Sequence, residues 1–406
     1  MSNLQPSDAK QTAEIVAWAA AEGRSLEIVA GGTKRALGRP MKTEHVLDLS
    51  RLSGIVSYEP AELVLTVRPG QPLAETVAEL AARGQMLAFE PTDWRAVLGS
   101  SGGQTLGGVI ACNLAGSRRV RAGSARDFIL GFSAVNGFGE AWKAGGKVVK
   151  NVTGYDMSKL QAGAYGTLSA LTEVTVKVTP KPETACTLLL RGLADDVAIP
   201  VLAQALNSPF EVSGAAHLPA AVARRSSVGV VSAGLAAATL LRLEGPRPSV
   251  AYRADTLEAL LGRGDRLDGA ETEAFWAELG AVKPLLAPDP RIVWRLCPTP
   301  SCAASLAQAC FAALPSAEVF YDWGGGLVWL SIGETEAGVD GGAARVRAAM
   351  KPAGGHATLI AAPEAVRASA PVFEPLEGAL AKLSERVKTS FDPRNILNPR
   401  RMHESW

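Results

Sequence analysis

The stretch from residue 101 to residue 127 constrains what this chain can fold into more than any other part of the sequence. It reads SGGQTLGGVIACNLAG, which holds five glycines and no charged residue, and then SRRVRAGSARD, which is rich in arginine. Glycines let a backbone come close to a ligand and adopt positive φ, while clustered arginines supply positive potential for an anion such as a diphosphate. These residues predict that a large phosphorylated cofactor binds in this region.

The distribution of charge supports a local anion site and argues against some other partners. The chain has 41 Lys and Arg against 40 Asp and Glu, so its net charge of +1 favours neither nucleic acid nor a membrane surface. Between residues 118 and 150, however, seven basic residues stand against two acidic ones. This surplus follows the glycine tract directly, where we expect the anion.

Cysteine and histidine usage gives no sign of a metal centre. The five cysteines form no CxxC pair and the histidines show no metal-binding spacing, which argues against disulfides and against zinc or an iron–sulfur cluster held by this chain. A reducing, cytoplasmic setting fits best. The N-terminus lacks a signal-peptide pattern and no stretch reaches ~18 uninterrupted apolar residues, so we expect membrane association only through partners. The sequence predicts no metal site and identifies no catalytic residue.

Hydrophobic periodicity predicts an α+β protein. An amphipathic helix over 7–22 precedes a strand that runs into AGGTKRALG, and further strands and a helix follow up to Thr-Pro-Lys-Pro at 179–182. Beyond it, two βαββα-like units predict one antiparallel sheet with helices on one face. We therefore expect a first domain over 1–182, a second over 183–365, and a C-terminal segment, 366–406, that returns to the first.

Three segments of the first domain suit an extended, phosphorylated ligand, although neither a P-loop nor a Rossmann fingerprint is present. In GGTK at 31–34, amides, a hydroxyl and an ammonium group can surround an oxyanion, and a tight turn is the alternative explanation. The tract at 104–116 is long, small and partly apolar, so it is expected to pack inward against a ligand. The segment 147–167 holds a dense polar set: Lys150, Asn151, Tyr155 and Asp156. Its Tyr155 is a proton donor, a shield for a ring face, or part of a helix cap.

Taken in order, these segments resemble the FAD-binding lobe of the vanillyl-alcohol oxidase type, or PCMH type, of flavoprotein. The resemblance covers roughly residues 7–182 and the C-terminal FDPRNILNPRRM. It implies two α+β subdomains that hold an extended FAD and a cap domain on the substrate side. It also implies FAD contacts from Gly31, Gly32, Thr33, Lys34, Pro91, Thr92, Asp93, Thr105, Leu106, Gly107, Gly108, Asn113, Gly116, Gly123, Ser124, Gly163, Gly166 and Thr167.

A narrower resemblance is to the FAD-binding E subunits of bacterial glycolate oxidases, and KNVTGYD at 150–156 is its most specific motif. It implies a subunit of a complex that oxidises glycolate, a 2-hydroxy acid, to glyoxylate. The implied partners are a larger FAD-binding subunit and an iron–sulfur subunit that receives the electrons. Because GGTK has no histidine, the implied FAD is non-covalent. Ala30 and Arg400 depart from the family pattern, which has a glycine at each of these positions.

The residues leave two other functions open. One is a stand-alone FAD-dependent 2-hydroxy acid dehydrogenase, and the other is an assembly subunit that keeps the fold without using FAD. The sequence also leaves open whether this subunit turns over substrate itself, which 2-hydroxy acid and electron acceptor are used, and the stoichiometry of the complex. Whether the arginines at 118–121 face FAD or a partner subunit is likewise open.

Overall fold

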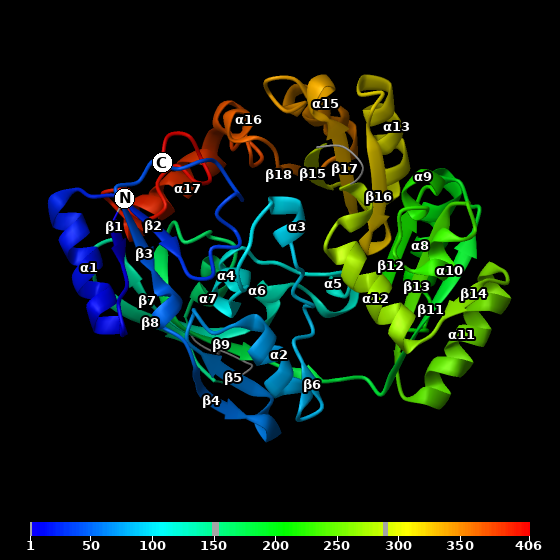
Figure 1. Ribbon diagram of the computed structural model, residues 1–406, viewed down its shortest axis with the longest axis horizontal. Coiled ribbons are helices and arrows are strands. Elements are labelled where there is room, and N and C mark those ends of the chain that lie inside the picture. The colour runs from blue at the N-terminus through cyan, green and yellow to red at the C-terminus, as the bar shows by residue number, and fades with distance from the viewer. Residues whose placement is uncertain (1, 148–153, 287–290) are drawn as a thin grey trace.

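The computed structural model describes residues 2–147, 154–286 and 291–406. Two lobes lie side by side in Figure 1. The first lobe comprises residues 2–180 together with the C-terminal residues 378–406, so both chain termini lie on it. The second lobe comprises residues 184–361 and is built on one large sheet.

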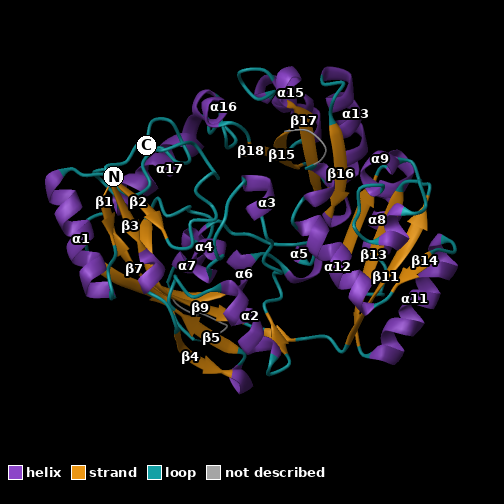
Figure 2. Ribbon diagram, in the orientation of Figure 1, coloured by secondary structure: helices purple, strands orange, loops and turns teal. Residues whose placement is uncertain are grey.

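The first lobe contains two main sheets, which Figure 2 shows in orange. The smaller is parallel, in the spatial order β1 (Ser2–Leu4), β3 (His45–Asp48), β2 (Leu26–Val29). The larger is antiparallel, in the order β4 (Ile55–Glu59), β5 (Val64–Val67), β9 (Ser169–Lys177), β7 (Ile129–Asn136), β8 (Ala141–Gly145). A separate antiparallel pair is formed by β6 (Gln85–Met86) and β10 (Thr179–Pro180).

Helix α1 (Ala9–Glu22) fills the space between these two sheets. It begins where the side chain of Asp8 accepts a hydrogen bond from the backbone N–H of Gln11, and it ends at Gly23, which adopts the left-handed conformation. Its Val16 and Ala19 are fully buried in a core that also contains residues of β2, β3, β7 and β9. Local capping and one apolar stripe therefore account for this helix.

Short helices join the two halves of the first lobe and face the second lobe (Figure 1). The glycine tract forms α4, and the arginine-rich run forms α5 and α6. Their bounds, with those of the other helices in this lobe, are α2 (Leu73–Ala81), α3 (Arg95–Leu98), α4 (Leu106–Ala111), α5 (Arg119–Ala122), α6 (Ala125–Phe128) and α7 (Met157–Gln161).

The second lobe contains one eight-stranded antiparallel sheet, as the sequence predicts. Its spatial order is β14 (Asp265–Leu267), β11 (Thr184–Arg191), β13 (Ala238–Gly245), β12 (Gly214–Leu218), β16 (Glu318–Asp322), β17 (Leu327–Gly333), β15 (Arg291–Cys297), β18 (His356–Ala361). Sequence reasoning did not identify β14.

The two faces of this sheet have different neighbours. Leu188 and Leu190 point to a core formed with α8 (Asp195–Leu206), α11 (Arg247–Leu261), α13 (Ala303–Ala313) and α15 (Ala343–Ala353). Leu189 points to the opposite face, which packs against α12 (Gly269–Gly280) and against Trp94 of the first lobe. The shorter helices of the second half of the chain are α9 (Ala220–Ala223), α10 (Gly229–Ser232), α14 (Glu334–Ala337) and α16 (Glu364–Ser369).

The C-terminal residues run back along the first lobe. After α17 (Gly378–Phe391), Leu26 N donates to Ile396 O at 2.8 Å and Ile28 N donates to Asn398 Oδ1 at 2.7 Å. Lys388 is buried and donates to Thr167 O at 2.7 Å. The chain end thereby lies beside β2 and the loop that follows it. Among the described residues, no helix is long and apolar enough to cross a membrane.

Candidate active site

A narrow cavity lies at the carboxyl end of β2, where the first lobe brings distant segments together. It is lined by residues 28–35, by the start of the glycine tract and by the C-terminal turn; the lining residues beyond 28–35 include Thr105, Gly107, Gly108, Ala111, Cys112, Gln161, Tyr165, Gly166, Asn398 and Arg401. We call it the first cavity.

The loop GGTK presents unpaired backbone N–H groups to the first cavity. Within the described residues, the backbone N–H groups of residues 31–34 donate no hydrogen bond. A Cβ added to Gly31 would lie 1.8 Å from Gly103 O, so only glycine allows the two loops to come this close. Gly32 has a φ of +70°, which a residue with a side chain adopts at a cost. The loop therefore exposes adjacent amide donors, an arrangement that binds anions.

Two cations reinforce this anion-binding character. Lys34 is buried, and its Nζ donates to Thr33 Oγ1 at 3.2 Å and Gln104 Oε1 at 3.0 Å. Burial lowers the pKa of Lys34, against the weaker opposing effects of nearby acidic groups. Arg401 is also buried and donates through Nη2 to Lys34 O at 2.6 Å. Neither cation forms an ion pair with a carboxylate of the described chain.

The first cavity also holds donors that lack partners. Gln161 Nε2 and Arg401 Nε are buried, and within the described residues neither finds an acceptor. Leaving a buried donor unpaired costs free energy. Unpaired donors, free amides and two unpaired cations around one cavity fit an extended anionic ligand such as the diphosphate of FAD.

A second cavity of about 620 Å³ lies between the first lobe, the edge of the large sheet and the C-terminal segment. Cys112 and Tyr165 line both cavities, so the two adjoin. Burial raises the pKa of the Cys112 thiol, which keeps it protonated. Other residues of the second cavity include Asn113, Ala115, Arg119, Gly163, Thr167, Arg295, His356, Thr358, Phe373, Glu374, His403 and Trp406.

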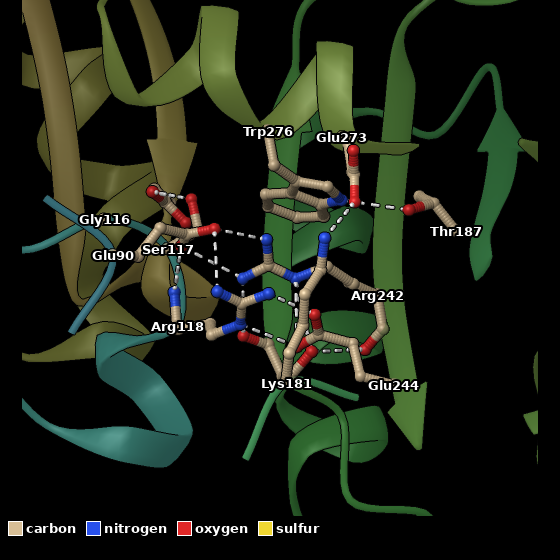
Figure 3. Close-up of polar contacts among 12 residues, drawn as sticks. Glu90, Gly116, Ser117, Arg118, Lys181, Thr187, Arg242, Glu244, Glu273 and Trp276 are labelled. Atoms are coloured by element: carbon tan, nitrogen blue, oxygen red, sulfur yellow. Dashed lines mark hydrogen bonds and ion pairs between the residues drawn. The ribbon is translucent and has the colours of Figure 1, made fainter. Parts of the chain in front are cut away.

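Arg118, from the arginine-rich run, lies at the contact between the lobes (Figure 3). Arg118 forms a two-pronged ion pair with Glu244 of β13, with Nε 2.9 Å from Oε2. Arg242 of the same strand reaches back to Glu90 at 2.7 and 3.1 Å, and its guanidinium lies 4.7 Å from the ring centroid of Trp276. These ion pairs hold the second lobe against the glycine tract.

Ion pairing and burial shift the pKa values of two acidic residues at this contact. Burial alone would raise the pKa of Glu244, but hydrogen bonding to Arg118 and the charges of both arginines lower it to about 2. Asp322 accepts hydrogen bonds from Ser117 Oγ at 2.6 Å and Trp323 N at 2.7 Å. Its complete burial nevertheless raises its pKa to about 7.

The arginines that sequence reasoning left between FAD and a partner subunit have neighbours within this chain. Arg118 pairs with Glu244, and Arg121 forms an exposed ion pair with Glu211. Arg119 lies over the ring of Trp323, with its Cζ 4.4 Å from the ring centroid. Of the three, Arg119 lines the second cavity, and the other two line neither of the two cavities.

The structure brings together many of the residues expected to contact FAD. The first cavity is lined by Gly31, Gly32, Thr33, Lys34, Thr105, Gly107, Gly108 and Gly166, and the second by Asn113, Gly163 and Thr167. The remaining residues line neither cavity: Pro91, Thr92, Asp93, Leu106, Gly116, Gly123 and Ser124. A Cβ on Gly116 would lie 2.8 Å from Glu90, and Gly123 has a φ of +99° next to the Ser124 capping box, so backbone geometry explains these glycines without a ligand.

The third segment contributes Gly163, Gly166 and Tyr165 to the cavities but not Tyr155. Tyr155 is 91% exposed and lines neither cavity, and Asp156 caps α7 by accepting a hydrogen bond from Lys159 N. The helix-cap alternative therefore describes this pair. Lys150 and Asn151 lie outside the described residues. Sequence reasoning did not select Arg401 or Gln161, although the NPRR turn gave a signal for the former.

Comparisons with known proteins agree with this geometry. A family model described as "FAD binding domain" matches residues 3–145. Glycolate oxidase subunit GlcE of Escherichia coli K12 is 35% identical over 379 residues, which cover 93% of this chain and 92% of that protein. Glycolate oxidase subunit GlcD of Bacillus subtilis is 28% identical over 239 residues, covering 57% and 49%. D-2-hydroxyglutarate dehydrogenase of Xanthomonas citri pv. viticola is 34% identical over 200 residues, covering 49% and 41%.

Solved structures with low sequence identity share the fold. The 4-ethylphenol oxidase of Gulosibacter chungangensis superposes with a TM-score of 0.70 at 13% identity, covering 99% of this chain and 88% of that one. An alkyldihydroxyacetonephosphate synthase gives 0.69 at 15%, covering 98% and 75%. The predicted FAD-binding lobe with a cap is thereby confirmed. With the GlcE match spanning nearly both chains, the protein belongs to the family of FAD-linked glycolate oxidase subunits represented by GlcE.

Proposed function

We propose that this chain is the FAD-binding subunit of a complex that oxidises glycolate to glyoxylate. The observation that carries the proposal is the pair of adjoining cavities: one is rich in unpaired donors and cations, and the other opens beside it between the two lobes. When bound, FAD supplies the two-electron oxidation, accepting a hydride from the substrate carbon. Residues 1–182 form the FAD-binding domain in this proposal, 183–365 the cap, and 366–406 the segment that completes the first domain.

The chain's own residues provide separate places for the cofactor and for the substrate. The amides of residues 31–34, with Lys34 and Arg401, would hold the diphosphate of FAD, and Cys112 and Tyr165 line the place where the two cavities adjoin. The second cavity receives the 2-hydroxy acid. A cavity enclosed by two lobes limits the access of water to the reacting atoms, which strengthens electrostatic interactions there.

We propose that the FAD is held without a covalent bond. The first cavity is lined by one cysteine, Cys112, whose thiol is kept protonated by burial and is therefore a poor nucleophile. Acid precipitation of the purified protein tests this. The expected result is that all yellow colour appears in the supernatant, whereas colour retained in the pellet would contradict the proposal.

We further propose that the chain works in a complex. The names of GlcE and GlcD describe both relatives as glycolate oxidase subunits, which suggests a larger FAD-binding partner; an iron–sulfur subunit is the proposed electron acceptor. The described cysteines are all free, which suits a reducing cytoplasm. Any attachment to the inner membrane would come through the partners.

Purification with and without partner subunits tests the function. The chain is expressed alone and together with the two partner subunits of its own organism, and reduction of an artificial electron-accepting dye by glycolate is measured. We expect FAD in both preparations and rapid turnover only in the complex. Rapid turnover by the isolated chain would favour a stand-alone dehydrogenase, and absence of FAD from the reconstituted chain would favour an assembly subunit.

A further inference from the structure

The second cavity contains two arginines whose guanidinium groups have no hydrogen-bond acceptor or carboxylate partner in the described chain. Arg119 comes from α5 in the first lobe, and Arg295 comes from β15 in the second. Neither guanidinium donates a hydrogen bond or pairs with a carboxylate among the described residues. By contrast, the neighbouring Arg118 and Arg121 are both ion-paired. The neighbours of Arg119 on the arginine-rich run are therefore neutralised within the chain, whereas Arg119 and Arg295 are not.

A single aromatic ring holds both arginines at the cavity wall. The Cζ atoms of Arg119 and Arg295 lie 4.4 and 5.1 Å from the ring centroid of Trp323. The ring is itself fixed, because Trp323 Nε1 donates to Gly116 O at 3.1 Å. Arginine stacks readily on an aromatic face and keeps its N–H groups free at the edge for other acceptors.

The cavity around them carries an excess of positive charge. Its one acidic lining residue, Glu374, is engaged by Arg347 at 2.6 Å. Burial lowers the pKa of Arg119, and the charge of Arg295 lowers it further. A bound anion would relieve the repulsion between the two guanidinium groups.

The pleat of the sheet aims this charge at the first lobe. Arg295 alternates with Trp294 and Leu296, which are buried in the core on the other face of the sheet. Its register partner on β18 is Thr358, which also lines the cavity. Arg119 follows the glycine tract by three residues, so the two guanidinium groups approach the same cavity from opposite lobes.

We propose that Arg119 and Arg295 form a clamp for the carboxylate of a small 2-hydroxy acid in the second cavity. The inference rests on the proposed function, because it places the substrate beside the residues where the two cavities adjoin. A planar guanidinium matches a carboxylate with two parallel hydrogen bonds. The clamp assembles only when the two lobes are in contact, so the ion pairs between them also serve substrate binding.

Oxalate binding to the FAD-loaded full-length protein tests the clamp. Oxalate is a non-oxidisable two-carbon dicarboxylate, and its dissociation constant is measured by calorimetry and by the perturbation of the visible flavin spectrum. We expect Arg119→Gln and Arg295→Gln each to raise the dissociation constant by about tenfold or more, since each removes charge-assisted hydrogen bonds. Arg121→Gln, from the same helix but exposed and paired with Glu211, is the matched control and should bind oxalate as the wild type does.

Two readouts separate a local effect from loss of structure. FAD content and melting temperature should remain those of the wild type in both glutamine variants. Should either variant lose FAD, Arg295→Lys and Arg119→Lys keep the charge while removing the planar fork, and they should still weaken oxalate binding. Oxalate binding that is unchanged in the glutamine and lysine variants, or absent from the wild type, would overturn the clamp.

The clamp and the proposed function can fail independently. A wild-type protein that is reduced by glycolate, but whose arginine variants bind oxalate normally, retains the function and loses the clamp. A protein that binds oxalate through both arginines, but whose complex with its partners is never reduced by glycolate or another 2-hydroxy acid, retains the anion site and loses the function.

Discussion

Replacing Arg118 by methionine should loosen the contact between the lobes without removing FAD. Arg118 is the main hydrogen-bonding partner of Glu244, whose side chain is 10% exposed. The pKa of Glu244 lies at about 2, against an ordinary value of 4.5. At about 1.36 kcal/mol per pKa unit, this corresponds to roughly 3 kcal/mol of preference for the ionised form. Arg242 at 3.7 Å retains part of it, so we expect Arg118→Met to cost about 2 kcal/mol of unfolding free energy.

Urea-induced unfolding followed by circular dichroism measures this cost, and a double-mutant cycle with Glu244→Gln isolates the pair. We expect a coupling free energy of about 2 kcal/mol. Arg121→Met, three residues further along the same run, is the matched control. Both side chains of its ion pair with Glu211 are more than half exposed, so its effect should stay within about 0.5 kcal/mol.

The FAD content of Arg118→Met decides between the possible roles of this arginine. The contact with Glu244 predicts a wild-type ratio of FAD to folded protein. Loss of FAD with unchanged stability would instead assign Arg118 to the cofactor, and loss of a partner subunit with unchanged stability would assign it to an interface. Either result would refute the reasoning.

Three further predictions concern a buried acid, a glycine and a strained turn. The pKa of Asp322 is raised to about 7, so its contribution to stability is fully present below pH 3.8 and is lost as pH rises through 7. In urea titrations, Asp322→Asn should therefore exceed the wild type in unfolding free energy by roughly 2–4 kcal/mol at pH 8, but by little at pH 4. A difference that does not depend on pH would contradict this. Gly31→Ala would push a methyl group into Gly103 O and should abolish FAD retention on a desalting column. Gly103→Ala is the control, because a Cβ there meets nothing within 4 Å, and it should keep FAD. Equal retention of FAD by the two variants would show that the loop contact is unimportant. Arg400 is exposed with a φ of +62°, so Arg400→Gly should stabilise the fold by about 1 kcal/mol in the same titrations, and a destabilised variant would point to an unrecognised contact of this side chain.

Patterns confined to neighbouring residues were sufficient to predict much of the fold. Helix α1 follows from a cap at Asp8 and an apolar stripe, and β9 follows from the alternation of Val174 and Val176, both fully buried. The antiparallel sheet of the second lobe follows from repeated strand and helix patterns. Its strand order was beyond sequence reasoning, because pairings such as β12 with β16 join segments about 100 residues apart.

The side-chain contacts of the arginine-rich run could not be predicted for the same reason. Glu244, the partner of Arg118, lies 126 residues further along the chain, and Trp323, which stacks on Arg119, lies further still. Local composition shows that positive charge is concentrated there, but it does not show which acidic side chains the fold brings to it. The contact between Arg401 and Lys34, 367 residues apart, was hidden in the same way.

The glycines of the candidate site show a second limit of sequence reasoning. Gly31 and Gly116 look alike in the sequence, yet Gly31 lines the first cavity whereas Gly116 makes room for Glu90. A glycine marks close approach by some group, and only the structure identifies that group as a ligand, a backbone or a side chain. The FAD contacts assigned to Gly116, Gly123 and Ser124 therefore remain predictions without support from the cavities.

Anaerobic titration of the purified complex with glycolate tests the central claim most directly. The protein is prepared with its FAD and its partners, and the visible flavin absorption is recorded after each addition. If this chain positions FAD for oxidation of a 2-hydroxy acid, the flavin band bleaches in proportion to the glycolate added, and glyoxylate appears in an amount equal to the glycolate consumed. Gly31→Ala, which should empty the first cavity, then reduces the bleaching by the share of the complex's FAD that the first cavity holds. A complex that carries no FAD on this chain, or whose flavin stays oxidised with every 2-hydroxy acid supplied, would contradict the account.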